Sequence, residues 1–160
     1  MSWKAELEQL FSDKERVAVL GAGSVLCGDD AAGMLVAAEL NEKIPGNCSL
    51  LALEGSTAPE NFCGVLRDYR PDLILLLDAA YMETAVAEIR FLDPAGIKGI
   101  NFSTHMLPLS VLVDYLREET SADVAVIGIQ PGSTDFDTAP SPEVQEACHQ
   151  LCDAILSACQ

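Results

Sequence analysis

Apolar and polar positions alternate along the chain in blocks that predict strands and helices in turn. Short apolar runs predict buried strands at residues 17–20, 49–53, 73–77, 87–91 and 124–129. Segments of helical composition lie between most of them, at residues 31–41, 58–66, 109–118 and 142–158. We expect Ser56 or Thr57 to cap the second of these helices, with Pro59 in its first turn, and Ser141 to cap the last.

This order of elements predicts the fold class. Strands that alternate with helices pair in parallel through right-handed crossovers, which gives a three-layer α/β/α sandwich around a mostly parallel, twisted sheet of roughly five strands. The run Leu73-Ile-Leu-Leu-Leu77 has no polar position, as expected for a central strand covered on both faces. We expect a single domain over residues 1–160, with residues 94–104 as its longest irregular stretch before a helix.

Residues 1–16 precede the first predicted strand and are expected to form an extra amphipathic helix. Its apolar stripe would consist of Trp3, Leu7, Leu10 and Phe11. We favour packing of this stripe on the chain's own domain over docking of a partner. The scattered charges of these residues leave no apolar core of a secretory signal, so a cytoplasmic location is expected.

The charge balance narrows the classes of partner. The 160 residues include 9 Lys and Arg against 25 Asp and Glu, a net charge of −16 with neutral His. A surface of this sign repels nucleic acid and anionic membranes, so we expect neither as a partner. With 49% hydrophobic and 21% charged residues, the composition is that of a globular protein. The sequence gives no reason for homodimerisation, so we expect a monomer.

Six cysteines raise the questions of disulfides, zinc and nucleophilic catalysis. Without a secretory signal, free thiols are expected. Cys148-His149-x-x-Cys152 is the tightest Cys/His cluster, but on a helix the two cysteines share a face from which His149 points away. We therefore favour small buried side chains over a zinc site, and we also disfavour Cys27 as a nucleophile.

Ligands of open α/β sheets bind beyond the carboxyl ends of the strands, and three predicted loops there carry polar side chains. The first begins with Gly21-Ala-Gly23, which imitates half of a dinucleotide-binding motif. However, Leu26 stands where the third glycine belongs, and Asp29 and Asp30 would repel a pyrophosphate at the helix entrance. Dinucleotide binding is therefore disfavoured.

The candidate site consists of Asp30 in the first loop, Asp78 directly after the third strand, and His105 in the loop before Pro108. Taken singly, each has a structural alternative, such as a helix cap or a hydrogen-bond partner of a neighbouring loop. Together, two carboxylates and one imidazole form a set that could hold Zn²⁺, Ni²⁺, Mn²⁺ or Fe²⁺ with open positions. Spacing alone selects neither the metal nor a catalytic over a metal-sensing role.

Five stretches around these residues carry a resemblance to a known family. They are GAGSVLCGDDAAG at 21–33, GSTAPEN at 55–61, LDA at 77–79, STHMLPL at 103–109 and GIQP at 128–131. In these stretches and in their order, the chain resembles the maturation endopeptidases of nickel–iron hydrogenases. Within that family it is most similar to the branch that processes the large subunit of hydrogenase 3, the formate-hydrogenlyase type.

The resemblance implies a nickel-dependent endopeptidase, of an aspartic and metal-dependent type, that clips a short carboxyl-terminal extension from the large-subunit precursor after nickel insertion. The metal-binding and catalytic positions of the family fall on Asp30, Asp78 and His105. Nickel would come with the precursor, and no organic cofactor is implied. The metal could polarise the scissile carbonyl or a water, or a carboxylate could act as general base, and the sequence leaves this open.

Two other functions stay open on the same residues. The first is a non-catalytic, nickel-dependent binding or chaperone protein for the hydrogenase precursor. The second is a metallohydrolase that holds its own metal ion.

Overall fold

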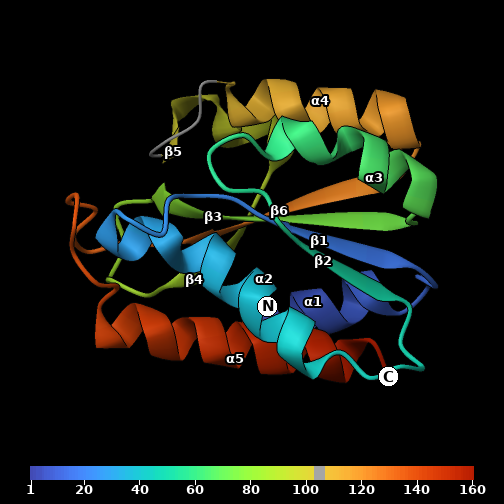
Figure 1. The fold of residues 1–160 in the computed structure, drawn as a ribbon, viewed down its shortest axis with the longest axis horizontal. Coiled ribbons are helices and arrows are strands. Elements are labelled where there is room, and N and C mark those ends of the chain that lie inside the picture. Colours follow the sequence, from blue (N-terminus) through green and yellow to red (C-terminus); the bar gives the residue numbers. More distant parts are fainter. Residues whose placement is uncertain (103–106) are drawn as a thin grey trace.

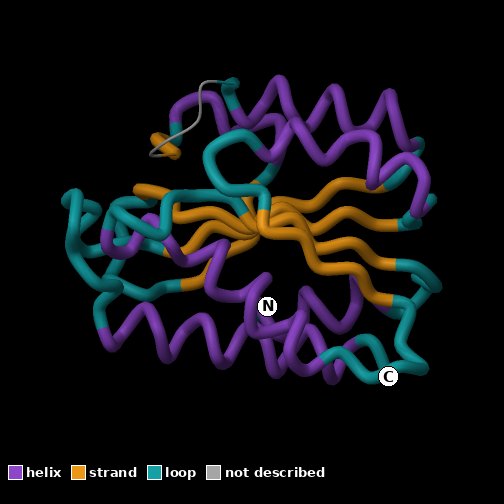
Figure 2. Tube along the Cα trace, in the orientation of Figure 1, coloured by secondary structure: helices purple, strands orange, loops and turns teal. Residues whose placement is uncertain are grey.

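A computed structural model describes residues 1–102 and 107–160 and has a central sheet between two layers of helices (Figures 1 and 2). The strands are β1 (Val17–Gly21), β2 (Leu50–Glu54), β3 (Leu73–Tyr81), β4 (Ile89–Leu92), β5 (Asn101–Phe102) and β6 (Asp123–Ile129). Their order is β2-β1-β3-β6-β4, in which the first four are parallel and β4 runs antiparallel to β6. The predicted fold class is confirmed.

The helices cover both faces of this sheet. They are α1 (Trp3–Phe11), α2 (Ala32–Lys43), α3 (Cys63–Tyr69), α4 (Leu109–Thr120) and α5 (Pro142–Ala158), with short 3₁₀ helices η1 (Gly28–Ala31), η2 (Pro59–Phe62) and η3 (Pro94–Gly99). In Figure 1, α1, α2 and α5 lie on one face, and α3 and α4 lie on the other.

The core explains why β3 is apolar at successive positions. Leu73, Leu75 and Leu77 pack with α1, α2 and α5, whereas Ile74 and Leu76 pack with α3 and α4. All five side chains are fully buried. A central strand with a helical layer on each side needs apolar side chains on both of its faces, and this sequence supplies them.

The amino-terminal helix packs on its own domain, as predicted. Ser2 caps α1 by accepting a hydrogen bond from the amide of Ala5. Leu7 and Phe11 are buried in the core beside α5, and Trp3 and Leu10 are partly buried against it. The apolar stripe of α1 therefore extends the core.

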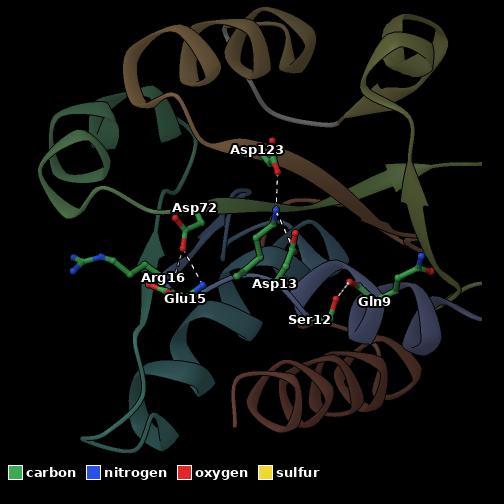
Figure 3. Close-up of polar contacts among 8 residues, drawn as sticks. Gln9, Ser12, Asp13, Glu15, Arg16, Asp72 and Asp123 are labelled. Atoms are coloured by element: carbon green, nitrogen blue, oxygen red, sulfur yellow. Dashed lines mark hydrogen bonds and ion pairs between the residues drawn. The ribbon is translucent and has the colours of Figure 1, made fainter.

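The segment after α1 is fastened to the amino edge of the sheet, where the parallel strands begin. Asp72, just before β3, accepts hydrogen bonds from the amides of Glu15 and Arg16, each at 2.9 Å (Figure 3). Lys14 Nζ lies 2.8 Å from Asp123 Oδ2 at the start of β6. These contacts fix the chain as it enters β1.

The structure differs from the predictions at two strands. β3 continues through residue 81, so Asp78 lies inside the strand and not in the loop after it. The extension exists because β6 pairs with it, Asp78 opposite Gly128, and because the short β5 pairs with Ala80 and Tyr81. β5 itself lies in the stretch predicted to be irregular, as does η3.

Of the two predicted amino-terminal helix caps, the structure confirms one and contradicts the other. Ser141 caps α5, with its hydroxyl accepting from the amide of Val144. The predicted helix at residues 58–66 begins instead as η2, with Pro59 in its first turn as expected. Its cap residue is Ala58, so the prediction of a Ser56 or Thr57 cap is wrong.

Candidate active site

The loops that follow β1, β2, β3 and β6 meet at the carboxyl edge of the sheet, on the left in Figure 1. The loop after β1 is held against its neighbours by backbone hydrogen bonds, from Ala22 to the carbonyl of Leu77 at 2.9 Å and from Gly23 to the carbonyl of Ser56 at 3.0 Å. Gly23 has a φ of 127°, and a Cβ there would overlap the carbonyl oxygen of Asp30. The glycine therefore serves close packing of the loop on η1.

Asp30 lies in η1 at the entrance to α2 and has no exposed surface. Its amide donates to the carbonyl of Cys27, and its Oδ2 accepts from the amide of Ser24 at 2.8 Å. Because a buried carboxylate is costly, the amide of Ser24 both offsets part of that cost and fixes the orientation of the carboxylate.

Asp29 is equally buried, with 1% of its surface exposed, but it faces a different part of the chain. Its Oδ1 accepts from the amide of Ser141 at 2.6 Å, and its Oδ2 accepts from the amide of Gly132 at 2.8 Å and the hydroxyl of Ser141 at 3.0 Å. These donors fasten η1 to both ends of the loop between β6 and α5. Asp29 is thus a structural residue, and its hydrogen-bond donors differ from the Ser24 amide that donates to Asp30.

Asp78 is 1% exposed and lies in β3 one residue beyond the point where β1 ends, since Gly21 is the last residue of β1 to pair, opposite Leu77. Side chains two residues apart in a strand point to the same face, so Asp78 lies on the face of Ile74 and Leu76, which α3 and α4 cover. Opposite it in β6 stands Gly128. A buried carboxylate that directly follows five apolar residues of the central strand, just beyond the end of β1, is a strong indication of a functional site.

Close backbone packing brings the two acids to the same edge. η1 contacts β3, and Gly33, three residues after Asp30, lies so near Leu77 that a Cβ on it would overlap the Leu77 carbonyl oxygen. Leu77 directly precedes Asp78. Buried carboxylates in such a place can bind a metal ion or act as a general base.

The third predicted residue, His105, lies outside the described residues, as do Ser103 and Thr104. Over residues 1–102 and 107–160, no group of three or more His, Cys, Asp or Glu side chains is placed to hold a metal ion. The predicted set of Asp30, Asp78 and His105 therefore stays a prediction as a set of three.

Gln130 is a further polar residue of this edge, directly after β6, and it is 8% exposed. Its Oε1 accepts from the amide of Met82 at 2.6 Å, and its Nε2 donates to the carbonyl of Pro131. It thereby holds the turn after β3 beside the end of β6. Sequence reasoning named the GIQP stretch but missed this role, because the partner of Gln130 is Met82, 48 residues earlier in the chain in the turn after β3.

The cysteine cluster on α5 is structural, as predicted. Cys148 and Cys152 are buried in the core, whereas His149 is exposed and forms a hydrogen bond with Glu39 of α2. Burial, and next the nearby Glu39, raise the pKa of Cys148 to about 12, which keeps this thiol protonated and unreactive. All six cysteines lie in the described ranges and are free thiols.

Comparisons with known proteins place this arrangement among proteases. The family model described as hydrogenase maturation protease, HycI, matches residues 34–158. The hydrogenase 3 maturation protease of Escherichia coli K12 is 35% identical over 136 residues, 82% of this chain and 85% of that protein. No helix among the described residues is long and apolar enough to cross a membrane.

Solved structures agree with this match. The crystal structure of the NiFe hydrogenase maturation protease HycI from Thermococcus kodakarensis superposes with a TM-score of 0.88 at 35% identity, over 96% of this chain and 97% of that one. The solution structure of the endopeptidase HycI from Escherichia coli superposes with a TM-score of 0.78 at 31% identity, over 89% and 90% of the two chains.

Proposed function

Because the chain belongs to the HycI family of hydrogenase maturation proteases, we propose that it is a nickel-dependent endopeptidase that acts on the precursor of a nickel–iron hydrogenase large subunit. It removes a short carboxyl-terminal extension after nickel has been inserted into that precursor. The observation that carries the proposal is the pair of buried carboxylates, Asp30 and Asp78, at the carboxyl edge of the family's sheet.

In this proposal the nickel ion belongs to the substrate. Asp30 and Asp78 bind it together with His105, whose part rests on the resemblance of residues 103–109 to the family. Carboxylate and imidazole ligands suit a divalent first-row metal such as nickel. A precursor without nickel would lack the cation that these residues bind in this proposal, so cleavage would be restricted to metal-loaded precursor.

Hydrolysis requires a water oxygen to bond to the scissile carbonyl carbon while the carbon–nitrogen bond breaks and a proton reaches the leaving amine. Asp30 or Asp78 could accept the proton of that water as a general base. Alternatively, the metal of the substrate supplies the polarisation and the carboxylates only position it. The amide of Ser24 supports either role, because it fixes the orientation of Asp30 in a site with little solvent.

The test compares nickel-loaded and nickel-free precursor of the large subunit from the same source organism, each incubated with the purified protein and followed by intact-mass spectrometry. We expect a loss of mass only for the nickel-loaded precursor, and less than about 0.1 metal ion per chain in the purified protein. Equal cleavage of the nickel-free precursor would refute nickel dependence.

Two further outcomes would replace the proposal with another function. A stable, nickel-dependent complex whose precursor keeps its mass would indicate a non-catalytic binding or chaperone protein. One tightly held metal ion per purified chain, needed for cleavage, would indicate a metallohydrolase with its own metal.

A further inference from the structure

Three exposed apolar side chains form a patch beside the candidate active site, which we call the rim patch. It consists of Val25, Leu26 and Phe136, which are 58%, 59% and 74% exposed. Val25 and Leu26 belong to the loop after β1, and Phe136 belongs to the loop between β6 and α5. Single exposed apolar residues are ordinary, but a group of them at one end of a sheet indicates an interaction site.

Backbone hydrogen bonds join the two loops that carry the rim patch. The amide of Asp137 donates to the carbonyl of Leu26 at 2.7 Å, and the amide of Gly28 donates to the carbonyl of Thr138 at 3.0 Å. Phe136 directly precedes Asp137, so its backbone lies beside that of Leu26. The two loops thus bring the backbones of Leu26 and Phe136, both with exposed side chains, close together at this edge of the sheet.

The rim patch is also tied to the buried carboxylates. Ser24, next to Val25 in the chain, donates its amide to Asp30 Oδ2 at 2.8 Å. Asp29 fastens both ends of the loop that carries Phe136, through the amides of Gly132 and Ser141. Loops held in this way lose little conformational freedom when a partner binds, which favours recognition.

The charge around the rim patch indicates what kind of partner it fits. Asp135 and Asp137, on either side of Phe136, are exposed. The loops after β1, β2, β3 and β6, at residues 22–31, 55–58, 82–88 and 130–141, contain no Lys or Arg. An acidic edge of this kind attracts a cationic segment and repels nucleic acid and anionic lipid.

We propose that the rim patch docks a stretch of the hydrogenase precursor in which apolar side chains stand beside Lys or Arg, and that this holds the scissile bond next to Asp30 and Asp78. The inference rests on the proposed function and adds the chemistry of the substrate segment to it. Phe136 and Leu26 supply the apolar contact, and the acids beside Phe136 supply the attraction for the cations.

The first experiment removes the apolar contact. In the full-length protein, the double variant L26S/F136S is compared with V65S/Y115S, which replaces one aliphatic and one aromatic side chain, 46% and 42% exposed, on α3 and α4. With nickel-loaded precursor as substrate, we expect KM to rise about tenfold or more for L26S/F136S with kcat within about twofold. V65S/Y115S should keep the KM of the unaltered protein.

The second experiment removes the attraction. D135N/D137N is compared with E146Q/D153N, which also removes two negative charges, but at exposed positions of α5. We expect KM to rise about threefold for D135N/D137N in low salt, and we expect added salt to raise the KM of the unaltered protein more steeply than that of this variant. Asparagine is chosen because Asp137 has a φ of 61°, which asparagine tolerates.

The outcomes separate this inference from the proposed function. If the unaltered protein cleaves the precursor and L26S/F136S has the same KM with intact folding by circular dichroism, the docking proposal is refuted and the protease stands. If the unaltered protein binds the precursor without cleaving it, the same variants are compared by dissociation constant, and a rise for L26S/F136S but not for V65S/Y115S supports the docking. A dimer of the unaltered protein in sedimentation that L26S/F136S dissociates would assign the rim patch to a second copy and overturn the proposal.

Discussion

Aspartates gather at both edges of the sheet, but the two edges place them in different surroundings. At the amino edge, Asp72 and Asp123 are exposed and meet amide or ammonium donors of the segment that leads into β1 (Figure 3). At the carboxyl edge, Asp29, Asp30 and Asp78 are at most 1% exposed. An exposed carboxylate with nearby donors loses little hydration free energy on folding. A buried carboxylate loses much more, so it is retained only for a structural or chemical reason.

The comparison also separates the buried acids from one another. Asp29 receives three hydrogen bonds from the ends of one loop, so its burial is explained by what it fastens. Asp30, in η1 after β1, and Asp78, in β3 just beyond the end of β1, lie at the carboxyl edge of the sheet, where ligands of such sheets bind. The residues that an acid touches therefore say more about its role than its burial does.

The largest expected effect comes from Asp78. The variant D78N keeps the shape of the side chain and removes its charge, and we expect cleavage of nickel-loaded precursor to fall about 10²–10⁴-fold in a folded protein. D72A at the amino edge is the control and should keep its activity. Initial rates by mass spectrometry and folding by circular dichroism check both, and a D78N rate within tenfold of the unaltered protein would remove Asp78 from the site.

Asp29 should give the largest loss of stability. D29A leaves the amides of Gly132 and Ser141 without their acceptor, and we expect the free energy of unfolding to fall by about 3 kcal/mol. Urea unfolding measures this change. D135A is the control, because Asp135 is an exposed acid of the loop between β6 and α5, which Asp29 holds in place. A loss below about 1 kcal/mol would mean that water replaces the carboxylate and that the fastening is weak.

Asp72 should have a smaller effect that depends on pH. Hydrogen bonds from the amides of Arg16 and Glu15 lower the pKa of Asp72 below its ordinary value. The stabilisation is therefore present above the ordinary Asp pKa of about 3.9 and is lost as the pH falls through the lowered value. D72A should lower the unfolding midpoint at pH 7 by less than D29A does, and the difference from the unaltered protein should shrink below about pH 4. A difference independent of pH would argue against the charged form as the acceptor.

The ion pair of Lys14 with Asp123 should matter least. The side chain of Lys14 is 13% exposed but that of Asp123 is 70% exposed, so solvent and salt screen the attraction at the carboxylate and the pair contributes little. We expect K14Q to unfold at the midpoint of the unaltered protein within error, in low and in high salt. A clear loss in low salt alone would show that the amino edge depends on this charge.

Much of the fold could be predicted because it follows from local pattern. The apolar run from Leu73 to Leu77 identified the central strand, and the alternation of elements gave the layers. The same topology rule predicted that Asp30 and Asp78 meet at one edge. The end of β3 could not be predicted, because it depends on pairing of Asp78 and Ala80 with strands that come later in the chain.

The separate roles of Asp29 and Asp30 were also beyond the sequence pattern. Both acids stand at the entrance of the same helix, and either could cap it. They are distinguished by the partner of Asp29, Ser141, which lies 112 residues further along the chain. Only tertiary structure brings that donor to the first loop.

The distance along the chain between Asp29 and Ser141 bears on how the protein is made. A ribosome adds roughly 5–20 residues per second, so about 5 to 20 seconds pass between the synthesis of Asp29 and that of its hydrogen-bond donors, Gly132 and Ser141. During that time α2 has no α5 to pack against, and the loop that carries Phe136 does not yet exist. We therefore expect a nascent chain to hold Asp30 and Asp78 well before it can cleave anything, with activity appearing only once the last helix has left the ribosome and folded.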